Sequence, residues 1–170
     1  GGIIAELGTN AQAGQGRYFV IEADEYDRAF HGLSPQVAVV TNVEMDHPDC
    51  YRDIGEMRSA FGIFLQCVPT KGWIVACADS PELTRVLAES EGLAGTWVAY
   101  GVSPEADYVV ADARLNRDGG VGFRVEKAGE PWGAFSLAIP GLHNALNATA
   151  ALIVAGLLGI DPSEAGRVLS

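Results

Sequence analysis

The chain has 170 residues, of which 48% are hydrophobic and 19% are charged. This length and balance are typical of one globular domain with a hydrophobic core, and they exclude an intrinsically disordered chain. With 11 basic and 22 acidic residues, the formal net charge is −11, which disfavours binding to nucleic acid or to anionic lipid surfaces.

Cysteine content and hydropathy indicate the compartment. Cys50, Cys67 and Cys77 show no paired or metal-binding spacing, which favours free thiols in a reducing cytoplasm. No run reaches the roughly 18 apolar residues of a membrane span. The start at Gly1 has neither a basic signal-peptide region nor an initiating Met. We therefore expect a cytoplasmic protein with no membrane partner, whose chain is cut from a longer one.

Short apolar runs rich in β-branched residues predict strands that are buried on both faces, as in a parallel sheet. These runs lie at residues 18–21, 37–40, 73–77 and 96–100. Apolar residues recur at helical spacing over residues 54–68, which predicts the crossover helix that two parallel strands require.

Capping signals predict the start of further helices. Ser80 is followed by Pro81 and Glu82, a pattern typical of a helix N-terminus. Residues 144–158 form a long Ala/Leu-rich pattern, and a capping box at residues 161–164 predicts one more helix.

Between these helices, three half-polar segments predict a small antiparallel meander. They cover residues 108–115, 121–127 and 134–139, with turn-forming residues at 118–120 and 129–131 between them. The expected fold class is therefore α/β, with a mostly parallel central sheet that is flanked by helices and carries a small antiparallel β-meander.

Four carboxylates lie within residues 22–27, at the end of the first predicted strand. Ligands of open α/β sheets bind at the carboxyl ends of the strands. Glu22 directly follows the apolar run, so it is a candidate oxygen ligand for a divalent cation. A solvated acidic turn is the alternative interpretation.

A second polar segment, residues 41–49, follows the next predicted strand and contains His47. Its imidazole is a candidate metal ligand, and Asp46 or Asp49 is a candidate for orienting the other ring nitrogen. A purely structural histidine is the alternative.

The third segment, residues 141–147, enters the long Ala-rich helix. Asn144 is a candidate helix cap, but an amide with donors and acceptors also suits recognition of adenine. The chain contains no GxxxxGK[ST] sequence, so it has no phosphate-binding loop of that type.

In this order, residues 20–27, 39–49 and 140–147 resemble the central domain of the Mur ligases, a P-loop-type domain. Within that family the chain most resembles the ligases that join L-alanine to UDP-N-acetylmuramate. The resemblance implies an ATP-dependent amide ligase of peptidoglycan precursor synthesis that works through an acyl phosphate. It implies ATP and Mg²⁺ as cofactors, and UDP-N-acetylmuramate and L-alanine as partners that are bound through other domains.

The resemblance also implies roles for four residues. Glu22 and His47 are expected to bind Mg²⁺ beside the ATP phosphates and to serve catalysis. His143 and Asn144 are expected to lie against the adenine. A bound cation would also explain how so acidic a chain can host an anionic reaction.

One departure from the family pattern concerns the extent of the chain. The phosphate-binding loop of the family is expected upstream of Gly1. We therefore expect residues 1–160 to be a central domain without that loop, and residues 161–170 to begin the connection to a C-terminal domain. The isolated 170-residue chain is expected to be inactive.

The other departure concerns the subfamily. Many Mur ligases carry a carbamylated lysine on the helix after the DH motif, whereas residues 54–67 hold Arg58 and no lysine. This disfavours the ligases that add later residues. Tyr26, where alanine ligases often have serine, keeps open a ligase that attaches a recycled tripeptide to UDP-N-acetylmuramate. The sequence is also compatible with a non-catalytic nucleotide-binding module and, more weakly, with a metal-dependent phosphohydrolase.

Overall fold

The computed structural model describes residues 2–5 and 7–170, which contain a six-stranded sheet whose strands lie in chain order. The strands are β1 (Val37–Val40), β2 (Trp73–Cys77), β3 (Thr96–Gly101), β4 (Tyr108–Leu115), β5 (Val121–Lys127) and β6 (Glu130–Leu137). Strands β1 to β4 pair in parallel, whereas β4, β5 and β6 pair antiparallel. The predicted α/β fold, with its parallel sheet and antiparallel meander, is confirmed.

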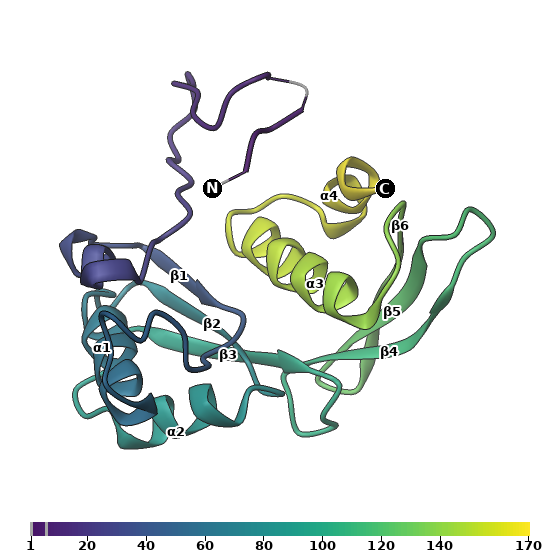
Figure 1. The fold of residues 1–170 in the computed structure, drawn as a ribbon. Helices are drawn as coiled ribbons and strands as arrows, with labels where there is room; N and C mark the ends of the chain where they lie inside the picture. Colours follow the sequence, from purple (N-terminus) through teal and green to yellow (C-terminus); the bar gives the residue numbers. More distant parts are fainter. Residues whose placement is uncertain (1, 6) are drawn as a thin grey trace.

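Helices cover both faces of the sheet (Figure 1). They are the 3₁₀ helix η1 (Tyr26–Gly32) and the α-helices α1 (Ile54–Gln66), α2 (Pro81–Glu89), α3 (Leu142–Leu157) and α4 (Pro162–Leu169). Helix α3 lies across one face, α1 and α2 lie on the other, and α4 packs against α3 and β6. Among residues 2–5 and 7–170, none of the helices has the length and apolar character that a membrane crossing requires.

The core lies where the parallel strands meet the helices. Ile74 and Val75 of β2 are both fully buried, although they point to opposite faces of the sheet. Leu65 of α1 and Leu152 of α3 are buried as well. The apolar run of β2 is therefore buried on both faces as predicted, whereas β1 buries Ala38 and Val40 on one face and leaves Val39, on the other, 41% exposed.

Side-chain caps set the beginnings of three helices. Asp53 accepts a hydrogen bond from the Glu56 N–H at 2.9 Å at the start of α1. Asp161 accepts one from the Ser163 N–H at 2.8 Å at the start of α4. The predicted starts of α2 after Ser80 and of α4 after Asp161 are confirmed.

The strand predicted at residues 18–21 is wrong. Phe19 and Val20 are 83% and 90% exposed, and the segment leads away from the sheet (Figure 1, dark purple). Strand β1 instead forms this edge of the sheet. β-branched and aromatic residues favour a pleated, half-buried surface, but a strand also needs a neighbour, which the local sequence does not specify.

The last strand of the meander also begins earlier than predicted. Lys127 pairs with Glu130, so Ala128 and Gly129 form a two-residue hairpin turn. Both have positive φ, 51° and 83°, as the tight hairpin turn matching the twist of the strands requires. Pro131 was predicted to lie in the turn, yet it is tolerated in β6 because β6 is an edge strand.

Ser80 joins the loop after β1 to the start of α2, and it is only 4% exposed. Its Oγ accepts hydrogen bonds from the N–H groups of Leu83 at 3.4 Å and Val43 at 3.2 Å. Its hydroxyl donates to Oδ1 of Asn42 at 2.9 Å. Because a hydroxyl offers one donor and two acceptor sites, Ser80 uses its full capacity here. The helix cap predicted from the sequence therefore also anchors Asn42 and Val43, in the same loop as His47.

The exposure of residues 18–21 predicts that polar substitutions there are tolerated. Val20→Lys should change the free energy of unfolding by no more than about 0.5 kcal/mol, because the side chain contacts little. Ile74→Ala, at a fully buried position, should lower it by about 2–5 kcal/mol. Urea unfolding followed by circular dichroism measures both. A loss from Val20→Lys as large as that from Ile74→Ala would show that the segment is buried in solution.

The double role of Ser80 predicts a larger loss than a cap alone provides. Asp53→Ala removes one capping bond and should lower the free energy of unfolding by about 1 kcal/mol. Ser80→Ala also leaves the buried Val43 N–H without its partner, so we expect a loss of about 2–3 kcal/mol. The same urea titrations compare the two variants. Equal losses would contradict a role of Ser80 beyond the cap.

Candidate functional site

The candidate site lies where two irregular segments meet near the end of β1. The first leads into η1 and contains Glu22 and Glu25, with Glu25 at the N-cap position of η1. The second is the loop of residues 41–53 between β1 and α1, which contains His47. Because this loop directly follows β1, it begins at the carboxyl edge of the parallel strands, where ligands of such sheets bind.

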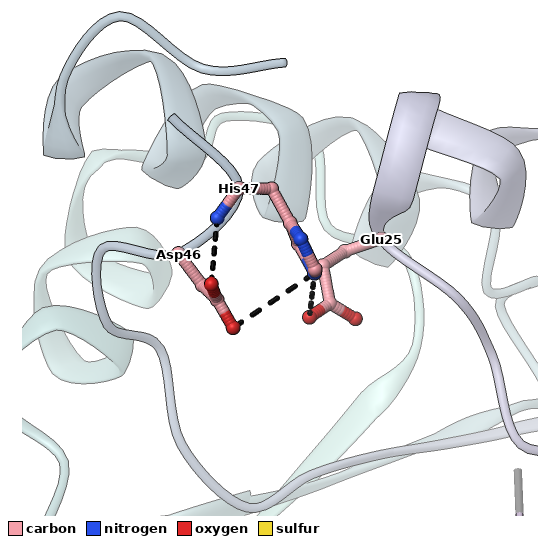
Figure 2. Close-up of side chains that lie close together, drawn as sticks. All are labelled: Glu25, Asp46 and His47. Carbon is pink, nitrogen blue, oxygen red and sulfur yellow. Dashed lines mark hydrogen bonds and ion pairs between the residues drawn. The ribbon is translucent and has the colours of Figure 1, made fainter. Parts of the chain in front are cut away.

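Three side chains from these segments form a compact cluster (Figure 2). The Nε2 atom of His47 lies 3.5 Å from Oε1 of Glu25 and 3.8 Å from Oδ2 of Asp46. One ligand atom from each of the three residues lies within 4.8 Å of the others. Figure 2 shows dashed lines from one nitrogen of the His47 ring to both carboxylates.

The backbone around His47 is held in a tight turn. His47 has φ of +52°, a left-handed conformation that is uncommon for residues other than glycine. Oδ1 of Asp46 accepts a hydrogen bond from the His47 N–H at 2.7 Å. The His47 carbonyl accepts hydrogen bonds from the N–H groups of Cys50 and Tyr51 at 2.8 and 3.0 Å. These bonds fix the direction in which the imidazole leaves the backbone.

The donor set of this cluster fits a divalent cation. Two carboxylates and one imidazole supply three ligand atoms, and water molecules complete the shell of an ion such as Mg²⁺. The three ligand atoms lie close enough together that all three side chains could contact one such ion.

The predicted pairing of Glu22 with His47 stays a prediction. Glu22 is exposed and is not part of the cluster, although it lines the same hollow of the N-terminal segment as Glu25. Glu25 is the cluster member that sequence reasoning missed. It belongs to the acidic run at residues 22–27, but only the turn of η1 shows that it faces His47.

The aspartates near His47 have separate partners. Asp46, which was predicted to orient His47, contacts both its backbone N–H and its ring. Asp49, the other candidate, instead accepts a hydrogen bond from the Tyr26 hydroxyl at 2.9 Å. This bond raises the pKa of Tyr26 above its usual range, because loss of the phenolic proton would place two negative charges together.

His143 and Asn144 lie in the first turn of α3, outside the cluster. Helix α3 begins at Leu142, so Asn144 lies inside the helix and is not its cap. Its Nδ2 donates to the carbonyl of Pro140 at 2.7 Å, while His143 is exposed. Gly141, with φ of +109°, has no side chain, and a Cβ there would lie 2.6 Å from Cε1 of His143. The backbone at Gly141 thus leaves room for the imidazole of His143.

Comparison with known proteins identifies the fold and the family. The model of the Mur ligase middle domain matches residues 4–155. The UDP-N-acetylmuramate--L-alanine ligase of Caldanaerobacter subterraneus subsp. tengcongensis is 38% identical over 165 residues, which are 97% of this chain and 35% of that protein. The chain spans about a third of the length of the curated relatives it matches.

Two solved structures show the same architecture. The UDP-N-acetylmuramate-alanine ligase of Thermotoga maritima has a TM-score of 0.80 and 26% identity, and the match covers 99% of this chain and 36% of that one. The UDP-N-acetylmuramate:L-alanyl-gamma-D-glutamyl-meso-diaminopimelate ligase of Neisseria meningitides has a TM-score of 0.78 and 30% identity, with coverage of 94% and 48%. With the family model matching most of its length, this chain belongs to the Mur ligase family, as a middle domain.

Proposed function

We propose that this chain handles the nucleotide in an ATP-dependent ligase that joins L-alanine to UDP-N-acetylmuramate during peptidoglycan precursor synthesis. The observation that carries the proposal is the cluster of Glu25, Asp46 and His47 at the carboxyl edge of a Mur ligase middle domain. The names of its relatives support L-alanine as the amine. The activity of the whole protein belongs to the proposal, because the chain spans a third of those relatives.

The proposed metal ligands are Glu22 and His47, as the sequence predicted, together with Glu25. His47 would bind through Nε2, the ring nitrogen that faces Glu25. Asp46 holds the backbone N–H of His47 and adds a second carboxylate beside the ring. When bound, Mg²⁺ would supply positive charge to the phosphate oxygens of ATP, which this chain of net charge −11 otherwise lacks.

The proposed reaction has two steps. The lactyl carboxylate of UDP-N-acetylmuramate attacks the terminal phosphorus of ATP, which forms an acyl phosphate and releases ADP. The amino group of L-alanine then attacks the acyl carbon, and inorganic phosphate leaves. Glu22, Glu25 and His47 would take part by orienting the terminal phosphate for in-line transfer.

His143 and Asn144 are the proposed contacts of the adenine. Asn144 is held by its bond to the Pro140 carbonyl, which uses one hydrogen of its Nδ2. The amide therefore keeps an acceptor and a second donor, which is the pair of groups that adenine recognition requires. The exposed imidazole of His143 offers a flat surface next to it.

The extent and location of the protein form part of the proposal. We assign residues 1–160 to a central ATP-binding domain and residues 161–170 to the start of a connection to a C-terminal domain. The length of the relatives supports further domains, which would bind UDP-N-acetylmuramate and L-alanine. A cytoplasmic location is consistent with three free cysteines, Cys50, Cys67 and Cys77.

A second candidate is a ligase that attaches a recycled murein tripeptide to UDP-N-acetylmuramate. Two observations favour it: the 30% identity to the structure from Neisseria meningitides, and Tyr26 at a position where alanine ligases often have serine. This candidate uses the same proposed site and differs only in the amine.

The full-length protein should release phosphate from ATP when UDP-N-acetylmuramate and L-alanine are both present. His47→Ala should lower the turnover number by about 100-fold, because it removes a metal ligand and little packing. The control is His31→Ala, since His31 Nε2 contacts the Ala60 carbonyl at 2.9 Å and is not part of the cluster. This variant should lower the unfolding temperature more than the turnover number.

The outcomes of this assay separate the candidates. Turnover with the tripeptide and not with L-alanine would favour the second candidate. Full activity of His47→Ala, or activity without ATP, would contradict both.

A further inference from the structure

The cluster is built from two segments that side chains, and not backbone bonds, hold together. Residues 22–32 and 41–53 are all described, and no backbone hydrogen bond joins the first segment to the second. Their relative position determines the separation of Glu25 from His47. The contacts between their side chains therefore control whether the cluster forms.

Two tyrosines, one from each segment, form hydrogen bonds across the junction between the two segments. Tyr26, the first residue of η1, donates its hydroxyl to Oδ2 of Asp49 at 2.9 Å. Tyr51, in the loop, donates its hydroxyl to the backbone carbonyl of Glu25. Each segment thus donates one tyrosine hydroxyl to an oxygen atom of the other segment.

Both tyrosines contact the residues of the cluster. Tyr51 donates its N–H to the His47 carbonyl at 3.0 Å and its hydroxyl to the Glu25 carbonyl, so it bridges the two residues directly. Tyr26 follows Glu25 in the chain, and its ring meets the His47 ring edge-on, with centroids 5.2 Å apart. Loss of either hydroxyl therefore leaves the contacts to His47 in place and frees the turn that carries Glu25.

Burial and packing hold the Tyr51 phenol in place as a donor. Tyr51 is 1% exposed, and the Arg28 guanidinium lies 5.0 Å from its ring centroid. The Tyr51 hydroxyl is therefore held against the Glu25 carbonyl by its surroundings.

The backbone on each side of the junction is strained. His47 has φ of +52°, and Asp27 and Arg28 in η1 have φ of +50° and +56°. Such conformations persist in residues other than glycine only where the surroundings hold them. The two phenols bridge these strained turns.

We propose that Tyr26 and Tyr51 are positioning residues that hold the Glu25 carboxylate beside His47, so that both side chains can reach one divalent cation. The inference rests on the proposed metal site. Neither tyrosine is a proposed metal ligand, so the inference gives both a role beyond the proposed metal site.

The test is titration of the chain with Mn²⁺ alone, with free Mn²⁺ followed by electron paramagnetic resonance well below the unfolding temperature. Tyr26→Phe and Tyr51→Phe should each weaken binding by about 10-fold, as for other residues that orient metal ligands. Tyr18→Phe is the matched control, because the Tyr18 hydroxyl has no hydrogen bond among the described residues. Its affinity should equal that of the unsubstituted chain.

A second comparison separates positioning from a general effect on stability. In a Glu25→Gln background, Tyr51→Phe should weaken Mn²⁺ binding no further, because the tyrosine acts through Glu25. A merely structural role would lower the unfolding temperature and leave the affinity of the folded protein unchanged. If Tyr51→Phe unfolds the chain, Tyr26→Phe still provides the test, since Tyr26 is 46% exposed.

Two results would overturn the inference. If the unsubstituted chain binds Mn²⁺ and both phenylalanine variants bind it equally well, the tyrosines do not position the cluster, and the metal site stands. If the unsubstituted chain does not bind Mn²⁺, the proposed metal site fails, and this inference fails with it.

Discussion

The close approach of His47 to Glu25 is the contact on which the candidate site depends. It joins the loop after β1 to the turn that opens η1, and it places an imidazole nitrogen 3.5 Å from a carboxylate oxygen. Ser80 anchors the same loop from the side of α2, through Asn42 and the Val43 N–H. Groups from the turn before η1 and from the start of α2 thus hold the loop of His47 from two directions.

The negative net charge of the chain makes a cation site at this contact important for binding an anionic nucleotide. A chain with net charge −11 repels a nucleotide triphosphate unless a cation compensates locally. Carboxylates gathered next to an imidazole at the carboxyl edge of a parallel sheet are suited to hold such a cation. The chain belongs to the Mur ligase family, and the relatives it matches are named as ligases of UDP-N-acetylmuramate and L-alanine.

Local signals predicted most of the fold, whereas long-range geometry decided what was missed. The apolar runs of β1 and β2 and the caps at Ser80 and Asp161 are local, and the structure confirms them. The strand at residues 18–21 was wrong, because pairing depends on a neighbour distant in sequence. Glu25 was missed for a similar reason: it faces His47 because the turn before η1 packs against the loop after β1, which no apolar or acidic pattern encodes.

The position of a bound cation tests the central claim most directly. In crystals of the chain grown with Mn²⁺, anomalous diffraction should show an ion about 2.1 Å from Nε2 of His47 and from a carboxylate oxygen of Glu25 or Glu22. Such a peak would also decide which glutamate is the ligand. An ion bound elsewhere on the chain, or no ion at all beside His47, would contradict the account.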